Sequence, residues 1–255
     1  MSAIRIFTLL FLLVLTSEIQ AQRPPGKDRE EWQDDMEKQF ELYVRNVRYQ
    51  RDHLPWADLH FGPASLAAAP LAFGSNSDIL PTELGRSWMW KFGAGMQYRW
   101  DKTPMVLQYG LRFSVHRLGL PDGRMVFASA DGGYEYGIVN PEYSRVQLVA
   151  SYLNIPLMLH FDYSKYGIGN GFTWGFGGEF GIRTNQYQRY TMPNAQGDDL
   201  RVKVSGPHGI SPIRYGLLTQ LGYKAYKISV GYDLNSFVDL ENNAHFVYFL
   251  LGIEL

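Results

Sequence analysis

The chain has 255 residues, with 24 lysines and arginines against 25 aspartates and glutamates, so its formal net charge is −1. This balance gives no basic bias and argues against nucleic acid as a partner. The chain has no cysteine, which excludes disulfides, thiolate metal sites, cysteine nucleophiles and the lipid-bearing cysteine of a lipoprotein.

The first residues are typical of an export signal. Arg5 precedes an apolar run from Ile6 to Leu15, and a short polar stretch leads to Ala21. This pattern predicts a secretory signal peptide over residues 1–21. The apolar run is too short to cross a bilayer as a helix, and the rest of the chain has no run of about 18 apolar residues. An exported chain of this kind can still enter a membrane if its strands close into a barrel.

Residues 22–57 are predicted to form a periplasmic extension with an amphipathic helix. Apolar side chains recur there at spacings of three and four residues, and acidic residues precede them: the apolar stripe is Trp32, Met36, Phe40, Tyr43 and Val47. One interpretation is a helix that lies across the periplasmic mouth of its own barrel. Another is a helix that docks a periplasmic or inner-membrane protein, and the acidic, proline-flanked composition also allows disorder.

The segment from Trp88 to Trp100 carries the clearest strand pattern. Every second residue is apolar or aromatic, and the residues between include Lys91, Gln97 and Arg99. Since a strand alternates its side chains between two faces, one face of this strand is apolar and the other polar. Its length at about 3.3 Å per residue and a tilt of about 45° spans roughly 28 Å. This is close to the apolar band of an outer-membrane barrel, about 25 Å tall with aromatic girdles at both edges.

The same alternation recurs along residues 58–255, which we expect to form an outer-membrane β-barrel domain. It predicts eight strands, at residues 58–73, 87–101, 105–117, 145–163, 172–190, 209–223, 225–236 and 244–255. Short turns alternate with longer loops at 74–86, 118–144, 191–208 and 237–243, which places both termini of the barrel domain on the periplasmic side. The first strand is the least regular, because Pro63 and Pro70 suit only bulges or strand ends.

We therefore expect an all-β fold. It is an eight-stranded antiparallel up-and-down transmembrane β-barrel, surrounded by outer-membrane lipid and preceded by a short periplasmic helix. A water-soluble protein that buries the apolar faces has the same periodicity. The export signal and the aromatic strand ends favour the membrane interpretation.

Polar side chains occupy the opposite strand faces, which line the lumen of a barrel: Gln108, Arg112, Ser114, His116, Asn154, His160, Asp162, Glu179, Arg183, Arg214, Gln220, Lys227, Asp233 and Glu254. Arg112, Glu179 and Asp233 each lie seven residues beyond the first outward residue of their strand, so we place them at one depth. Because an unpaired buried charge is costly, they predict an interior salt-bridge network. Eight strands leave an interior that side chains can fill, so a water channel is not expected.

Several segments resemble a known family. The segment SYLNIPLMLHF, from Ser151 to Phe161, is similar to the Tyr-Leu-x-Ile-Pro-Leu strand of the PorT-like outer-membrane barrels. LHFG, from Leu59 to Gly62, and the closing FLLGIEL resemble the first and last strands of that family. The resemblance covers residues 58–255 and implies a small bacterial outer-membrane barrel. Some members belong to the type IX secretion apparatus, which implies a structural or assembly role. The chain departs from the family in ending at Leu255 rather than at an aromatic residue, and in the extension over residues 23–57.

An enzyme is the main alternative, because some eight-stranded barrels modify lipid A. Ser114 and His116 lie two residues apart and superficially suit a nucleophile and a base. Both fall on the lumen face, however, and no acid lies near them in the sequence, so we interpret them as an interior polar pair. No metal-ligand spacing or phosphate-binding glycine loop is present. We expect no catalytic residue, no cofactor and no metal.

The sequence therefore predicts a non-enzymatic structural or assembly component with a periplasmic or secretion-system partner. A second alternative is a ligand- or surface-binding barrel that acts through residues 118–144, where Gly132-Gly133-Tyr134-Glu135-Tyr136 presents aromatic side chains outward.

Overall fold

The computed structural model describes residues 53–67, 80–100, 103–131, 133–163, 171–239 and 244–254, together with Lys38. The predicted signal peptide and the apolar stripe Trp32, Met36, Phe40, Tyr43 and Val47 lie outside these residues. No helix among the described residues is long and apolar enough to cross a membrane.

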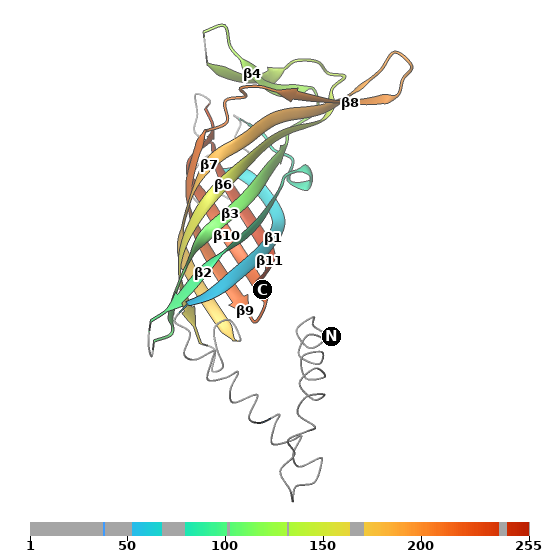
Figure 1. Cartoon of the computed structure of the whole chain (residues 1–255). Helices are drawn as coiled ribbons and strands as arrows, with labels where there is room; N and C mark the ends of the chain where they lie inside the picture. The colour runs from blue at the N-terminus through green and yellow to red at the C-terminus, as the bar shows by residue number, and fades with distance from the viewer. Residues whose placement is uncertain are drawn as a thin grey trace, which may run out of the picture. The chain divides into compact units, whose positions relative to one another are not determined.

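Eight of the described strands form a closed barrel (Figure 1). In chain order they are β1 (His53–Ala67), β2 (Trp88–Arg99), β3 (Met105–Gly119), β6 (Ser144–Asp162), β7 (Phe172–Pro193), β9 (Ile213–Tyr223), β10 (Tyr226–Val238) and β11 (Ala244–Glu254). Each pairs antiparallel with the next, and β1 pairs with β11, for example Leu59 with Ile253. The expected eight antiparallel strands are confirmed. Closure leaves no unpaired strand edge around the barrel.

The connections differ at the two ends of the barrel. At the short-turn end, β2 is followed closely by β3, β6 by β7, and β9 by β10. At the long-loop end, the connections contain further structure: the 3₁₀ turn Leu84–Arg86, the hairpin of β4 (Arg124–Ala128) and β5 (Tyr134–Ile138), and β8 (Asp199–Ser205). β8 pairs with the last seven residues of β7, from Tyr187 to Pro193, so the sheet continues beyond the closed ring (Figure 1). The segment predicted as a plain loop over 118–144 therefore contains a two-stranded sheet.

The first strand differs from its prediction. β1 (His53–Ala67) begins at His53 rather than at residue 58, so residues 53–57 form part of a barrel strand and not of the extension. The predicted end of this strand, over residues 68–73, lies outside the described residues. β1 pairs with β2 from His53 opposite Tyr98 to Pro63 opposite Trp88. The β1–β11 ladder omits Gly62 and Pro63, which suits a residue that has no N–H to donate.

The outer face of the sheet is apolar on every strand. Its side chains are 41 to 59% exposed: Leu59, Phe92, Leu111, Leu157, Phe176, Leu217, Ile228 and Leu251, one for each strand in chain order. The predicted lumen residues lie on the inner face, and all of them are buried except Arg183 and Glu254, which are partly exposed. A water-soluble protein would bury the apolar face and expose the charged one. The observed arrangement is the reverse, as a lipid environment requires.

A closed barrel that starts at His53 does not need the preceding segment. Deleting residues 23–50 should leave membrane insertion intact, with a folded band in unheated detergent that shifts on heating. Deleting residues 53–67 should abolish that shift, because β2 and β11 would each lose a partner and expose an edge in lipid. Gel electrophoresis of heated and unheated membrane fractions measures both. Loss of the shift in the first deletion would show that closure depends on the extension.

Candidate functional site

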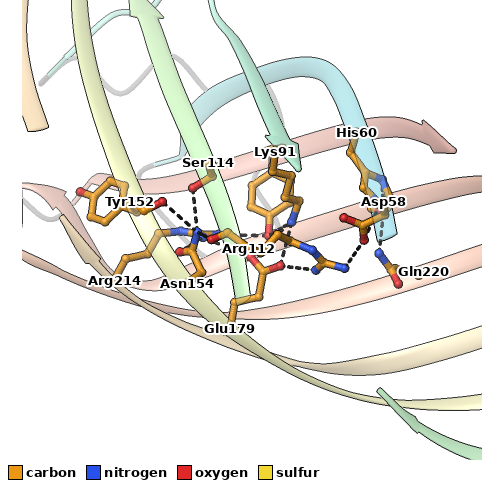
Figure 2. A network of polar contacts seen from close by, with 12 residues as sticks. Asp58, His60, Lys91, Arg112, Ser114, Tyr152, Asn154, Glu179, Arg214 and Gln220 are labelled. Carbon is orange, nitrogen blue, oxygen red and sulfur yellow. Dashed lines mark hydrogen bonds and ion pairs between the residues drawn. The ribbon is translucent and has the colours of Figure 1, made fainter. Parts of the chain in front are cut away.

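Each strand of the barrel contributes one buried side chain to a network of polar contacts at mid-depth. In strand order these are Asp58, Lys91, Arg112, Asn154, Glu179, Arg214, Asp233 and Tyr248, none more than 5% exposed. We call this set the interior network. Figure 2 shows how its labelled members converge from different strands. The strand alternation explains this convergence, since every second residue of each strand faces the lumen.

Glu179 is the centre of the interior network, because three cations contact its carboxylate. Lys91 Nζ lies 3.1 Å from Oε1 and 3.2 Å from Oε2. An Arg112 guanidinium nitrogen donates to Oε1 at 2.5 Å, and an Arg214 nitrogen donates to Oε2 at 3.2 Å. Charge-assisted hydrogen bonds of this kind are roughly twice as strong as neutral ones.

The two arginines extend the network to the other carboxylates. Arg112 also pairs with Asp58. Arg214 Nε donates to both oxygens of Asp233, at 2.9 and 2.8 Å. The structure therefore brings the predicted Arg112, Glu179 and Asp233 into one network, in which Arg112 contacts Glu179 directly and Asp233 is joined to it through Arg214.

Charges in the interior network balance. Lys91, Arg112 and Arg214 carry three positive charges, and Asp58, Glu179 and Asp233 carry three negative ones. The Tyr248 hydroxyl accepts hydrogen bonds from Lys91 at 3.3 Å and from Arg214 at 3.1 Å, and Asn154 Oδ1 accepts one from Arg214 at 3.1 Å. Since each buried charge has an opposite partner, the desolvation cost is offset within the lumen.

Glycines on the inner face make room for these large side chains. A Cβ atom at Gly93 would lie 2.8 Å from Cγ of Arg112, and one at Gly231 would overlap the ring of Tyr248. Both glycines lie on strands beside the side chain that they admit. The interior network therefore depends on small residues as well as on charged ones.

A second polar layer fills the lumen at the short-turn end. The Glu254 carboxylate accepts hydrogen bonds from Gln97 and Gln108, each at 3.1 Å, and lies 3.5 Å from Lys227 Nζ. An Arg99 nitrogen lies 2.6 Å from Asp162. The cavity between these side chains has a volume of only about 10 Å³, enough for about one water molecule.

Apolar side chains fill the lumen at the long-loop end, and the Ser114–His116 pair lies among them. Ser114 Oγ is 3.0 Å from His116 Nε2, and both residues are fully buried. The imidazole ring packs on Phe246, Tyr152 and Phe237, with centroids 4.5, 5.1 and 5.9 Å away. Within the described residues, the other ring nitrogen has no hydrogen-bond partner. The pair therefore has no carboxylate to orient the histidine.

Beside this apolar layer lies a larger cavity of about 380 Å³, which we call the mouth cavity. Its lining comes from β5, β7, the β8–β9 connection and the end of β10: Tyr134, Arg183, Gln186, Pro207, Gly209, Ile210, Ser211, Pro212, Asn235, Ser236 and Asp239. Arg183 was expected in the lumen, and it lines this cavity at the rim. The volume lies within the range of small-molecule sites, about 300 to 1,000 Å³.

Gln188 on β7 links two segments that each contribute residues to the mouth cavity, the β4–β5 hairpin and the β8–β9 connection. Its side chain accepts a hydrogen bond from Val126 N of the β4–β5 hairpin at 3.2 Å and donates one to Val126 O. Its amide nitrogen also lies 2.8 Å from Nδ1 of His208, and burial lowers the pKa of His208, which favours the neutral ring that can accept this bond. Gly209, at φ +66°, then passes close to Tyr134, where a Cβ atom would lie 2.7 Å from the ring.

Of the residues that form these sites, the alternation predicts only some. It places Lys91 and Arg214 on inner faces, but nothing in the sequence marks them as partners of Glu179. Asp58 falls at the expected start of the first strand, where no inward face can be assigned. Among the described residues, no group of three or more His, Cys, Asp or Glu side chains is arranged to hold a metal ion.

Replacing Arg112 by Met should destabilise the folded barrel by about 3 to 5 kcal/mol, because Asp58 and Glu179 lose a buried partner. Adding Glu179→Gln to this variant restores equal numbers of positive and negative charges and should recover part of the loss. The exposed Lys224 gives a matched control, and Lys224→Met should cost little. Urea unfolding in detergent measures all three. An Arg112→Met variant that unfolds at the same urea concentration as the parent would contradict this account of the network.

The solved structures similar to this chain include three barrel or surface proteins, all at low identity. Neisserial surface protein A (NspA) is 12% identical, with 80% of this chain and 97% of that chain covered and a TM-score of 0.33. Ail, the attachment invasion locus protein of Yersinia pestis, is 11% identical, with 80% and 100% covered and a TM-score of 0.33. The N-terminal β-barrel domain of Pseudomonas aeruginosa OprF is 8% identical, with 78% and 97% covered and a TM-score of 0.27.

No curated protein matches the chain significantly. The sequence pattern of one family, the outer membrane protein beta-barrel domain, matches residues 75–248. This range covers more than half of the chain and includes the strands from β2 to β10 and the first part of β11. The closed eight-stranded sheet, its apolar outer face and its charged interior agree with that match. The chain belongs to the outer membrane protein beta-barrel domain family.

Proposed function

We propose that this protein is a non-enzymatic, non-conducting barrel that binds a ligand at its extracellular mouth. Outer-membrane barrels place short turns in the periplasm and longer loops outside the cell, so the long-loop end is the extracellular end. The observation that carries the proposal is a contrast along the barrel. Side chains fill the described lumen at three levels, whereas the mouth cavity of about 380 Å³ lies at the extracellular end.

The lining of the mouth cavity suits an uncharged, hydroxyl-bearing ligand such as a saccharide. It offers one cation, Arg183, one carboxylate, Asp239, and one aromatic ring, Tyr134. The Arg183 guanidinium already donates to the Ile210 carbonyl, which reduces its capacity for a free anion. Gln186 Oε1 is buried and has no hydrogen-bond partner among the described residues. Gln186 also lines the cavity, and its side-chain amide can donate a hydrogen bond to a ligand hydroxyl.

The chemistry of the Ser114–His116 pair supports binding over lipid A modification. Neither side chain reaches solvent, and aromatic rings cover the histidine. A hydrolytic pair needs a carboxylate or equivalent group to orient the base and needs access for the substrate. The interior hydrogen bond between Ser114 Oγ and His116 Nε2 accounts for the pair without catalysis.

The binding proposal predicts that the detergent-solubilised full chain retains members of a panel of immobilised mono- and oligosaccharides. Gln186→Leu and Asp239→Asn should each weaken retention about tenfold or more, because each removes a polar group that lines the mouth cavity. Arg201→Gln, on the exposed strand β8, is the control and should bind like the parent. The proposal fails if the parent protein retains no saccharide, or if both cavity variants bind like the parent.

A second candidate is an assembly role, in line with the resemblance to PorT-like barrels and with the stripe from Trp32 to Val47. In this case the stripe docks a periplasmic partner of a secretion system. Phe40→Asp combined with Tyr43→Asp should then abolish co-purification of that partner from solubilised membranes, because charge on an apolar helix face opposes its burial. Identical sets of co-purified proteins from the parent and the double variant would exclude this role.

A further inference from the structure

Three basic side chains gather on one face of the sheet at the extracellular ends of β3, β7 and β8. Arg117 on β3 lies opposite Val149 on β6, which lies opposite Tyr187 on β7. Arg189 follows Tyr187 by two residues and lies opposite Lys203 on β8. Since every second residue of a strand points to the same face, the three cations share one face. We call Arg117, Arg189 and Lys203 the outer basic cluster.

Contacts with aromatic rings place this cluster on the outer face of the barrel. The Arg117 guanidinium lies 4.2 Å from the ring centroid of Trp88, its neighbour on β2. Trp88 in turn packs 5.7 Å from Phe61, an outward side chain that is 58% exposed. Lys203 Nζ lies 4.1 Å from the ring of Tyr187. The cluster therefore lies directly beyond the aromatic edge of the apolar belt, where lipid headgroups begin.

The positive charges of the outer basic cluster have no carboxylate partner. Within the described part of the chain, the ion pairs involve other residues, and none of the three cations lies within 4 Å of a carboxylate. Arg117 and Arg189 are close enough to repel each other, and Arg189 faces Lys203 directly across the ladder. The Tyr187 side chain is a hydrogen-bond partner of Arg117, and the buried Nε of Arg117 has none among the described residues. Like charges placed opposite each other destabilise a sheet.

An anion that binds between these side chains would relieve the repulsion. Arginine presents paired N–H groups that match the oxygens of a phosphate group. The cluster lies on the outward face, at the level of the outer-leaflet headgroups. This position favours a phosphate group that belongs to a lipid. We propose that Arg117, Arg189 and Lys203 bind a phosphate group of a glycolipid in the outer leaflet. This inference is independent of the mouth cavity, because it concerns a different face of the barrel.

The test measures binding of bisphosphorylated lipid A to the full-length protein in an uncharged detergent, by native mass spectrometry and by the shift of the thermal unfolding midpoint. We expect saturable binding that raises the midpoint and weakens as salt increases, since phosphate–cation attraction is screened. Dephosphorylated lipid A should bind at least about tenfold more weakly than the bisphosphorylated form. Inorganic phosphate at the same concentration should leave the midpoint unchanged.

The variant Arg117→Gln/Arg189→Gln/Lys203→Gln should lose the preference for phosphorylated lipid A. Lys224→Gln is the matched control, because Lys224 also lies over an exposed aromatic ring, that of Tyr223, but at the short-turn end and alone. It should bind like the parent. If the triple variant does not fold, the exposed Lys203→Gln variant alone should still weaken binding. Equal binding of phosphorylated and dephosphorylated lipid A, equal protection by inorganic phosphate, or unchanged binding by the folded triple variant would overturn the proposal.

Discussion

The structure depends on the requirement that every backbone N–H and C=O group in a lipid environment has a partner within the protein. Water is absent there, so an open strand edge would leave a row of polar groups unpaired. The β1–β11 ladder meets this requirement by joining the ends of an eight-stranded sheet that starts at His53. Closure divides the side chains into an outer set that contacts lipid and an inner set that contacts only other side chains.

The inner set differs from an apolar core because it contains charged side chains, each of which needs a partner of opposite charge. Eight strands enclose a narrow space, and the sequence places three cations and three carboxylates in it at mid-depth. The carboxylate of Glu179 joins β7 to β2, β3 and β9 through Lys91, Arg112 and Arg214. β9 is a neighbour of β7 in the sheet, but β2 and β3 are not, so the contacts with Lys91 and Arg112 connect strands across the lumen.

Closure also restricts the places at which a ligand can bind to the extracellular end and the outer surface. With the lumen filled, a ligand can reach only the rim, the loops and the lipid-facing side. The rim holds the mouth cavity, and Gln188 joins two segments that contribute to its lining, the β4–β5 hairpin and the segment around His208. The outward side holds Arg117, which has no carboxylate partner among the described residues.

Much of the barrel can be predicted from the sequence, because strand alternation in lipid is strict where large apolar residues mark the outer face. Trp88 to Arg99 and Leu153 to Phe161 are examples, and both lie in strands at the predicted positions. The start of β1 is harder to predict, because Pro55, Pro63 and the small residues from Ala67 onward give no regular outer face.

The contacts between side chains across the lumen are harder still to predict from the sequence. Which cation meets Glu179 depends on the tilt and register of all eight strands, and these follow from closure rather than from any local pattern. The same holds for the mouth cavity and the outer basic cluster. The mouth cavity includes Tyr134 of β5 and the outer basic cluster includes Lys203 of β8, and both strands lie in segments that the sequence predicts as loops. The helix predicted around Phe40 lies outside the described residues and stays a prediction.

The central claim is that side chains close the lumen, so the protein acts through its surfaces and not as a pore. Conductance of the purified full chain in planar lipid bilayers tests this most directly. The account predicts no stable openings across the voltage range in which porins conduct, because the interior network and the layers on either side of it fill an eight-stranded barrel. Reproducible, porin-sized openings from the pure protein would contradict it.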